Sequence, residues 1–425
     1  MEFKPYWHAT APLFTNAAGG NVEGKFDVAV VGGGFTGLSA ARQLAKSGVS
    51  VVLLEARHVG YGGSGRNGGH LNNGLAHSYI AAKSALGAER ARTLYRAFDS
   101  AVDTIEAIVA EEGIDCSFRR AGKLKLASKA KHFDGIARNF EAVHSEVDPD
   151  TALLSKADLR GEIGSDEFHG AMLSKKSAMM HMGRFVHGLA EAATRRGATI
   201  YEEAPVTGRT KTADGWNLST PRGHVTADRV LVATNAYTEG PFDYFRRRII
   251  PVGSFIIATR PLTADEIART MPGNRTCVTS LNIGNYFRLA PDNRLLFGGR
   301  ARFSAVSDAT SDAKSGEILR ASMARIFPHL RNIEIDYCWG GLVGMTKDRF
   351  PRAGSVDGLY YSMGYSGHGA QLSTYMGVIM ADLIGSGVNR NPLEGMDWPS
   401  VPGHFGKPWF LPIVGLYYRL LDRIQ

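Results

Sequence analysis

The residues with the clearest chemical role are the glycines of a G-x-G-x-x-G sequence, Gly32, Gly34 and Gly37, and the acid Glu55. Glycines at this spacing allow a tight turn and let the backbone approach a phosphate, while the helix that follows directs its N–H groups at the anion. Glu55 stands about 20 residues further on, where an acid accepts hydrogen bonds from ribose hydroxyls. The combination predicts a dinucleotide site; a glycine turn in an ordinary α/β domain is the alternative.

The segments around these glycines have the periodicities of a strand–turn–helix–strand unit. Residues 26–31 form a short β-branched run typical of a buried parallel strand, and residues 49–54 form a second. Between them, Leu38, Ala41 and Leu44 recur at helical spacing. We therefore expect a Rossmann-like unit near the start of the chain, with the helix N-terminus facing the phosphates.

Two further glycine-rich segments extend this pattern. Residues 60–69 (GYGGSGRNGG) follow the unit directly, and residues 364–369 (GYSGHG) lie between a predicted strand and a predicted helix at 370–384. A nicotinamide cofactor needs no second glycine turn, whereas a flavin combines an adenine nucleotide with a separate redox ring. The second helix would direct its positive end at that ring, which gains negative charge on reduction. His368 is the titratable candidate beside it.

Composition limits the class of protein. The chain has 425 residues, 44% of them apolar and 21% charged, which is typical of a soluble globular protein of about two domains. The net charge is +8, and the basic residues are scattered along the chain apart from 195–196 and 246–248. This pattern favours a solvated basic surface over a nucleic-acid patch, so we expect no nucleic-acid partner. Three distant cysteines argue against a disulfide framework and a zinc site, and we expect no metal.

The two ends of the chain bear on location. The N-terminus lacks an apolar signal core and no run approaches 18 apolar residues, so we expect a cytoplasmic protein without a transmembrane segment. The C-terminal residues 408–425 (PWFLPIVGLYYRLLDRIQ) are apolar and aromatic with interspersed charges. Two interpretations stay open for them: a helix packed on the body of the protein, which we favour, or a peripheral membrane contact.

Five stretches of the sequence resemble a known family. They are VVGGGFTGLSAARQLA, LLEARHVGYGGSGRNGG, VLVATNAYT, NYFRLAPDNRLLFGGR and MGYSGHGAQL. In order and spacing they are similar to the FAD-dependent D-amino-acid oxidase and sarcosine oxidase superfamily, above all to its gamma-glutamylputrescine oxidoreductase branch. The likeness covers nearly the whole chain. It implies FAD as cofactor, a small amine or amino acid as substrate, and O₂ or another electron acceptor.

The expected fold class is α/β, with an α+β substrate part. We expect mostly helix over 78–159, a helix at 183–196, and strands at 198–203, 229–234, 249–260, 284–304 and 359–363, the fourth with a hairpin turn at 291–293. The resemblance implies a Rossmann-like FAD-binding domain interleaved with an antiparallel-sheet substrate domain. We assign 1–80, 175–238 and 336–425 to the first and 81–174 and 239–335 to the second.

The resemblance also implies roles for individual residues. For the adenosine and pyrophosphate it implies Gly32, Gly34, Phe35, Thr36, Gly37, Glu55, Ala56, Arg57, Gly63, Ser64, Val206, Thr234 and Asn235. For the flavin side it implies Arg66, Asn67, Gly68, Gly341, Thr346, Gly367, His368, Gly369 and Gln371. The substrate cavity would lie over the ring, under a sheet that carries Tyr286, Arg288 and Arg300.

Two departures from the family pattern are informative. Sarcosine oxidases tether their flavin through a cysteine four residues before a Met-Thr pair; here the pair is Met345-Thr346 and that position is Gly341, with Cys338 three residues too early. We therefore expect noncovalent FAD. The lysine that binds the substrate carboxylate in those enzymes is replaced by Gln371, which disfavours a small N-methyl amino acid.

The implied chemistry is oxidation of a C–N bond, with hydride transfer from a neutral amine to flavin N5 and hydrolysis of the imine. The candidate catalytic residues have open roles: His368 as a base or in shaping its loop, Arg288 on a substrate carboxylate or in a structural salt bridge, and Tyr286 as cavity wall or core. The leading hypothesis is a gamma-glutamylputrescine-type amine. The alternatives are another amine or amino acid (N-methyl, cyclic or D-) and a flavin-binding subunit without turnover of its own.

Overall fold

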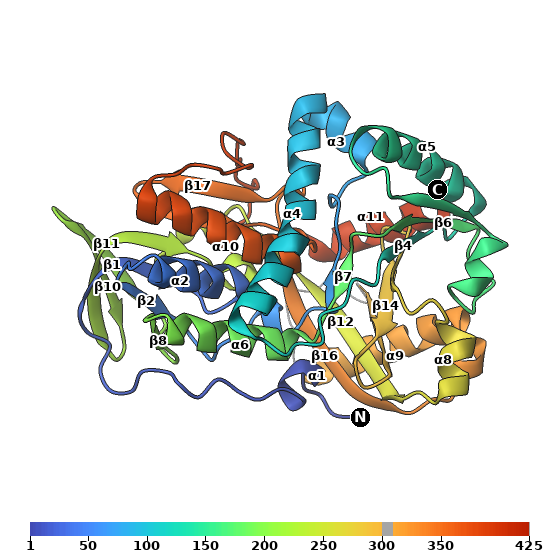
Figure 1. Ribbon diagram of the computed structural model, residues 1–425, viewed down its shortest axis with the longest axis horizontal. Coiled ribbons are helices and arrows are strands. Elements are labelled where there is room, and N and C mark those ends of the chain that lie inside the picture. The colour runs from blue at the N-terminus through green and yellow to red at the C-terminus, as the bar shows by residue number, and fades with distance from the viewer. Residues whose placement is uncertain (300–308, 425) are drawn as a thin grey trace.

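Two eight-stranded sheets organise the protein, whose computed structural model describes residues 1–299 and 309–424. In Figure 1 the first sheet lies on the left and the second on the right, and the long helix α4 crosses the middle of the view. The first sheet has the order β17-β18-β11-β1-β2-β8, and β10 and β9 extend it from β11. Its strands are β1 (Lys25–Val31), β2 (Val51–Leu54), β8 (Thr199–Tyr201), β9 (Gly208–Thr212), β10 (Gly215–Thr220), β11 (Gly223–Val232), β17 (Arg352–Val356) and β18 (Leu359–Met363).

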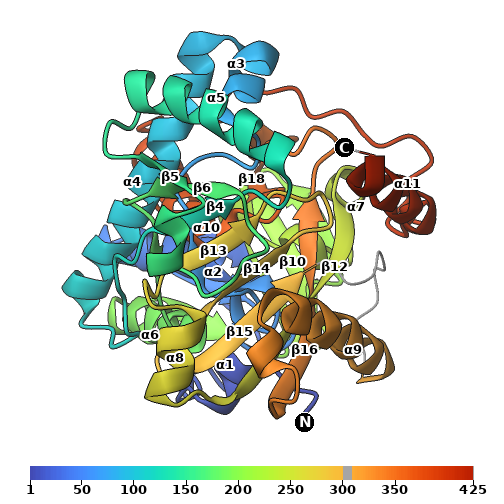
Figure 2. The ribbon, with the colours of Figure 1, turned by 90° about the vertical axis from the view of Figure 1, so that its right-hand side faces the viewer.

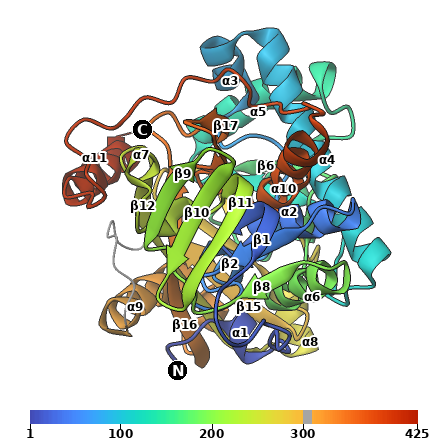
Figure 3. The same ribbon diagram turned by 90° about the vertical axis from the view of Figure 1, so that its left-hand side faces the viewer.

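The central strands of the first sheet are parallel. β1 pairs in parallel with both β2 and β11, and β11 pairs in parallel with β18 (Figure 3). All residues of β2 are buried, as are Val28–Val31 in β1, as the continuous apolar runs predict for a parallel sheet covered on both faces. This arrangement brings the carboxyl ends of β1 and β18, and the glycine turns that follow them, to the same edge.

The second sheet is largely antiparallel and has the order β16-β12-β15-β14-β13-β4-β6-β5. Its strands are β4 (Lys123–Leu126), β5 (Ala152–Ser155), β6 (Gly170–Ser174), β12 (Ile250–Pro261), β13 (Thr276–Thr279), β14 (Asn285–Leu289), β15 (Arg294–Gly299) and β16 (Ile335–Met345). A small third sheet joins β3 (His70–Leu71) to β7 (Ala178–Met179). Figure 2 shows the second sheet from its outer side.

Helices cover both sheets. The α-helices are α1 (Tyr6–Ala9), α2 (Phe35–Lys46), α3 (Tyr79–Leu86), α4 (Ala88–Glu112), α5 (Ala130–Glu146), α6 (Met182–Arg195), α7 (Asp243–Arg246), α8 (Ala264–Thr270), α9 (Ala309–Ile326), α10 (Gly369–Ser386) and α11 (Leu411–Ile424). The short 3₁₀ helices are η1 (Gly63–Gly65), η2 (Asp158–Gly161), η3 (Asn235–Tyr237) and η4 (Pro328–Leu330).

Close packing of α2 and α10 explains two glycines. A Cβ added at Gly37 would lie 1.9 Å from the carbonyl oxygen of Gly32, and one added at Gly377 would lie 2.5 Å from that of Thr36. Only glycine lets the turn after β1 fold against α2 and lets α10 cross it (Figure 1). The two glycine turns are therefore held side by side by their own helices.

Most sequence expectations for the fold are confirmed. The Rossmann-like unit, the strand at 359–363 and the hairpin turn at 291–293 are all present. The helical prediction for 78–159 was wrong in part, because β4 and β5 lie within it. Of the strand expected at 284–304, residues 300–304 lie outside the described residues. The domain division stays a prediction; β16, which begins near residue 336, pairs with β12 of the second sheet.

Candidate active site

One large cavity, of about 1300 Å³, is lined by residues of both sheets. It exceeds the range of about 300–1,000 Å³ that serves most small ligands, so it has room for a dinucleotide and a substrate. The two glycine motifs meet in it: the hydroxyl groups of Thr36 and Tyr365 are hydrogen-bonded at 2.8 Å. Segments more than 300 residues apart thus form one wall, as the flavin hypothesis requires.

Almost all predicted site residues line this cavity. The lining includes Gly32, Gly34, Phe35, Thr36, Glu55, Ala56, Arg57, Gly63, Ser64, Arg66, Asn67, Gly68, Val206, Thr234, Asn235, Tyr286, Gly341, Thr346, Gly367, His368, Gly369 and Gln371. Two of the predicted residues that the structure describes are absent from it. Gly37 supports the turn from behind, through the packing described above, and Arg288 is fully buried elsewhere.

The part of the cavity around Gly32–Thr36, Glu55 and Val206, here called the nucleotide end, is shaped by backbone. Glu55 accepts hydrogen bonds from the N–H groups of Gly33 at 2.6 Å and Arg57 at 2.8 Å. Burial raises the pKa of its carboxyl group above the ordinary value, and these two N–H groups oppose the rise. A carboxylate has about four acceptor positions, so Glu55 retains capacity for ribose hydroxyls.

The turn itself fits a pyrophosphate. Gly32 has a φ of +112°, and a Cβ at Gly34 would lie 2.9 Å from Ser64 Oγ, which accepts a hydrogen bond from the N–H of Phe35. The first N–H groups of α2 have no partner within the helix, and the helix dipole favours an anion there. The glycine turn, the helix end and the acid together fit the adenosine diphosphate part of FAD.

The glycine-rich loop 60–69 is tied down by its own polar residues. Arg66 donates to the carbonyl oxygens of Tyr61 at 2.7 Å and Gly340 at 3.1 Å, which joins the loop to β16. The amide of Asn67 donates to the carbonyl oxygen of Ser64 at 2.8 Å. The loop is thus an ordered part of the wall rather than a linker.

The segment after β16 and the turn before α10 form the wall predicted to face the flavin ring. The N–H of Thr346 donates to Ser366 Oγ at 3.3 Å, and the N–H of Ser366 donates to the carbonyl oxygen of Gly344 at 3.0 Å. The side chain of Asn235 accepts a hydrogen bond from the N–H of Gly364 at 2.9 Å. Asn235 therefore contacts the segments predicted to surround the ring, although the sequence placed it towards the adenine.

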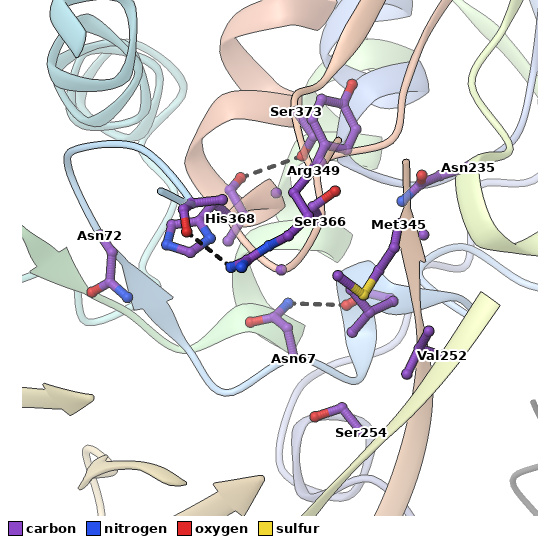
Figure 4. A pocket seen from close by; sticks show the side chains of 18 of the residues that line it. Asn67, Asn72, Asn235, Val252, Ser254, Met345, Arg349, Ser366, His368 and Ser373 are labelled. Atoms are coloured by element: carbon purple, nitrogen blue, oxygen red, sulfur yellow. Dashed lines mark hydrogen bonds between the residues drawn. The ribbon is translucent and has the colours of Figure 1, made fainter. Parts of the chain in front are cut away.

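His368 is half-buried at the N-cap of α10 and lines the cavity. Burial, with Lys123, Arg349 and Lys125 nearby, lowers the pKa of its imidazole to about 3. The ring is therefore neutral at physiological pH, and its Nδ1 has no hydrogen-bond partner among the described residues. Figure 4 shows His368 between Asn72 and Arg349, with Met345 towards the other side of the view. A neutral imidazole here can accept or donate a hydrogen bond but is a weak base.

The other two candidate catalytic residues differ in placement. Tyr286 lines the cavity, and its hydroxyl group is 3.0 Å from Ser254 Oγ. Arg288 instead donates to the carbonyl oxygens of Gly69 at 2.6 Å and Met180 at 3.1 Å. Arg288 has no exposed surface and lies outside the lining, and these bonds support the loop from behind. Its place fits the structural alternative better than a contact with a substrate carboxylate. Arg300 lies outside the described residues.

Sequence reasoning missed three cations that line the cavity near His368. Lys123 and Lys125 alternate with two buried leucines along β4, so both lysines point to the cavity face of the sheet. Their ammonium groups donate to the carbonyl oxygens of Asn73 at 2.6 Å and Thr279 at 3.0 Å. Burial lowers the pKa of each to about 8. The alternation K-L-K-L is a strand pattern that could have revealed them.

Arg349 completes this cationic group. It follows β16, its guanidinium donates to the carbonyl oxygen of Ala76 at 2.9 Å, and its Nε has no hydrogen-bond partner among the described residues. Burial lowers the pKa of Arg349 as well. We call the part of the cavity formed by Lys123, Lys125, Arg349 and His368 the substrate end.

Three more features shape the cavity. His70 lines the cavity beside Tyr286, with ring centroids 5.5 Å apart. The amide of Gln371 donates to the carbonyl oxygen of Asn72 at 2.5 Å, which joins α10 to the segment after β3. Residues of the C-terminal region also line the cavity: they are Phe410, Leu411, Val414 and Tyr418.

Neither a cluster of metal ligands nor a cysteine is found among the described residues that line the cavity. Among residues 1–299 and 309–424, no group of three or more His, Cys, Asp or Glu side chains could hold a metal ion. Cys116, Cys277 and Cys338 are buried, and none of the three lines the cavity. Noncovalent attachment of FAD stays a prediction.

Comparisons with known proteins agree with this geometry. The family model described as DAO, FAD dependent oxidoreductase, matches residues 27–383. A gamma-glutamylputrescine oxidoreductase from Escherichia coli is 33% identical over 408 residues, covering 94% of this chain and 93% of the relative. A probable oxidoreductase, OrdL, from Haemophilus influenzae is 33% identical over 410 residues, covering 94% and 92%.

Solved structures support the fold. Glycine oxidase from Geobacillus kaustophilus superposes with a TM-score of 0.73 at 23% identity, covering 85% of this chain and 94% of that one. L-proline dehydrogenase from P. horikoshii gives a TM-score of 0.72 at 22% identity, covering 88% and 96%. The match to the family model and the two relatives of 33% identity, over a cavity built from both glycine motifs, show that the chain belongs to the DAO family of FAD-dependent oxidoreductases.

Proposed function

We propose that this oxidoreductase oxidises an amine that also carries a carboxylate, of the gamma-glutamylputrescine type. The observation that carries the proposal is the charge of the substrate end, where Lys123, Lys125 and Arg349 face the cavity. Among the described lining residues the only carboxylates are Glu55 and Glu239. Glu55 belongs to the nucleotide end, and Glu239 stands beside Gly240, which packs against the backbone of Val206 there.

The cations of the substrate end would have two effects on such a substrate. They attract the carboxylate of a glutamyl group through charge-assisted hydrogen bonds. They also disfavour an ammonium ion nearby, so that the reacting amine is held in its neutral form. Putrescine carries two ammonium groups and no anion, so the same charges select against it. The name of the 33% identical relative supports gamma-glutamylputrescine as the first substrate to test.

The residues of this chain would bind and orient the substrate and the cofactor. FAD, when bound, would supply the ring that accepts the electrons lost by the substrate. The nucleotide end would hold the adenosine diphosphate part through the turn before α2, with Glu55 on the ribose. The backbone of residues 341–346 and 367–369 would face the ring, next to the positive end of α10. His368, which is neutral, would hydrogen-bond the substrate rather than remove a proton from an ammonium group.

A second candidate rests on the same cations. A small amino acid also presents a carboxylate, and relatives named glycine oxidase and sarcosine oxidase subunit beta are 26% identical to this chain. Gln371 stands where the sarcosine enzymes have a lysine, which disfavours N-methyl amino acids. Lys125 and Arg349 could take over the carboxylate in that case.

An anaerobic substrate panel tests the proposal. The FAD-loaded protein is mixed without oxygen with gamma-glutamylputrescine, putrescine, glycine, sarcosine and proline, and the loss of flavin absorbance is followed. We expect the fastest reduction with gamma-glutamylputrescine. Faster reduction by putrescine would contradict the role of the cations, and faster reduction by an amino acid would favour the second candidate. Peroxide formed on admission of air identifies O₂ as an acceptor.

Acid precipitation tests the attachment of FAD. Because no cysteine lines the cavity, we propose that FAD is held without a covalent bond. Precipitation of the yellow protein should leave the colour in the supernatant. Colour retained in the washed pellet would contradict this.

A further inference from the structure

An exposed apolar face lies at the C-terminal end of the chain. It consists of Phe405, Trp409, Ile413, Leu416, Tyr417, Leu420 and Ile424, each between 55% and 74% exposed. These are seven of the thirteen exposed large hydrophobic residues found within the described chain, and the other six are scattered over its length. Single exposed apolar residues are ordinary, but a contiguous group marks an interaction surface. We call this group the docking face.

The helix α11 presents most of this face because of its sequence period. Ile413, Leu416, Leu420 and Ile424 recur three or four residues apart, which places them along one side. Leu411 and Gly415 lie on the opposite side and are buried against the body. The helix therefore has apolar residues on both its inner, buried side and its outer, exposed side.

The inner side is firmly attached. The carboxylate of Asp422 accepts hydrogen bonds from the N–H groups of Asn282 and Ile283, both at 2.8 Å. Lys129 donates to the carbonyl oxygen of Asp422 at 2.5 Å. The helix lies at the edge of the molecule (Figures 2 and 3). These contacts fix its rotation, so the exposed docking face is held outward.

Exposed basic residues border the docking face. Arg419 and Arg423 lie four residues apart on α11, and Lys407 precedes the helix. Arg247 lies over the ring of Phe405, with 5.5 Å from its guanidinium carbon to the ring centroid. The one acid of the helix, Asp422, is turned towards the body by the hydrogen bonds described above. The surface is thus apolar with a cationic border.

We propose that the docking face lies on a membrane surface that contains anionic lipid. An amphipathic helix with aromatic and aliphatic residues bordered by arginine is the arrangement that inserts at the boundary between headgroups and acyl chains. A second copy of the chain fits less well, because the one acid of α11, Asp422, is turned towards the body and cannot pair with the arginines of a second helix. No helix of the described residues is long and apolar enough to cross a membrane, so the contact would be peripheral.

The position of α11 connects this contact to the active site. Leu411, Val414 and Tyr418, on the inner side of the helix, and Phe410 just before it, line the cavity. Docking would therefore place this wall of the cavity next to the bilayer. The inference does not depend on the identity of the amine substrate.

Vesicle sedimentation with the full-length, FAD-loaded protein tests the proposal. We compare vesicles of phosphatidylcholine alone with vesicles that contain phosphatidylglycerol as well. We expect strong binding to the second kind, weakened by raising the salt concentration because surface charges are screened. Equal binding to both kinds, or binding to neither, would overturn the role of anionic lipid.

Matched variants locate the contact. Leu416→Gln with Leu420→Gln should weaken vesicle binding by about tenfold or more, because two apolar side chains leave the interface. Arg419→Gln with Arg423→Gln should reduce binding only to anionic vesicles. The controls Ile318→Gln, at an exposed apolar position outside the face, and Lys25→Gln, at an exposed basic position on β1, should bind like the wild type.

Tryptophan fluorescence provides a second readout. Of the five tryptophans, Trp409 is 68% exposed and the other four are at most 8% exposed. Vesicles with brominated acyl chains should quench the wild type, and Trp409→Phe should abolish that quenching while vesicle binding persists. Unchanged quenching in this variant would contradict the assigned surface. A wild-type dimer in solution that the double leucine variant converts to a monomer would instead identify the face as an interface between copies.

Discussion

The two ends of the cavity are formed by different kinds of groups. At the nucleotide end, the contacts come from backbone N–H groups and from glycines that allow close approach, and Glu55 is held by two backbone donors. At the substrate end, long side chains face the cavity: those of Lys123 and Lys125 on β4, and that of Arg349 after β16. The first end requires a fixed spacing in the chain, whereas the second requires only that the fold bring long side chains together. The comparison suggests that cofactor binding and substrate choice can be changed separately.

A single methyl group at Gly37 should break the nucleotide end. In Gly37→Ala the new Cβ would lie 1.9 Å from the carbonyl oxygen of Gly32, so the turn must move. Forced overpacking of this kind typically costs about 1–3 kcal/mol. We expect a lower melting temperature and loss of most of the bound FAD, measured from the ratio of flavin to protein absorbance.

The matched control is Gly19→Ala, where an added Cβ meets nothing within 4 Å. It should keep the wild-type melting temperature and FAD content. A Gly37→Ala protein with full FAD content would show that the close approach of α2 to β1 is not needed for cofactor binding.

Removal of one cation should weaken the substrate end without affecting the cofactor. In Lys125→Met the chain length is kept and the charge is lost. We expect kcat/KM for gamma-glutamylputrescine to fall by roughly tenfold to a hundredfold, which corresponds to about 1.5–3 kcal/mol for a charge-assisted hydrogen bond. FAD content should not change. Lys131→Met, at an exposed lysine on the same cavity, should lose less than about threefold.

Arg288 should behave as a structural residue despite its charge. Arg288→Met removes a hydrogen-bond donor from the carbonyl oxygens of Gly69 and Met180, which costs about 1–3 kcal/mol of folding free energy. We expect a lower melting temperature in thermal unfolding. The ratio of kcat/KM values for gamma-glutamylputrescine and putrescine should stay at the wild-type value, and a collapse of that ratio would restore Arg288 as a carboxylate-binding residue.

The smallest expected effect is on pH dependence. Burial lowers the pKa of Lys123 and Lys125 to about 8, so both are largely charged below that pH and lose their charge above it. The substrate carboxylate then loses its partners, and KM for gamma-glutamylputrescine should rise several-fold from about pH 7.5 to 9.5. KM for putrescine should not rise, because its ammonium groups are repelled less. A wild-type KM that does not change with pH, or a KM that rises as much in Lys125→Met as in the wild type, would contradict the role of these lysines.

The difference between the ends also explains what could be predicted from the sequence. Gly32, Gly34 and Gly37 are close in the chain, so their spacing alone identified the turn and its role. The turn at Gly367–Gly369 was found in the same way, and both line one cavity. The fold class followed from these local units and from the resemblance they carry.

The three cations of the substrate end were missed because tertiary contacts bring them together. Lys123 and Lys125 lay inside a segment expected to be helical, where their alternation with leucine was overlooked. Arg288 occupies a strand near the cavity, but the direction of its side chain, towards Gly69, depends on how the loop 60–69 folds back. No local pattern contains that information. The outward face of α11 likewise depends on Asp422 binding a distant loop.

The most direct test of the account combines one protein change with one substrate change. Rates of anaerobic flavin reduction are measured for the wild type and Lys125→Met, each with gamma-glutamylputrescine and with the analogue that lacks the carboxylate. If Lys125 binds that carboxylate, each single change should slow reduction at low substrate by about tenfold or more, and the two together should slow it little further. Losses that simply multiply would show that Lys125 and the carboxylate act independently, and would contradict the account.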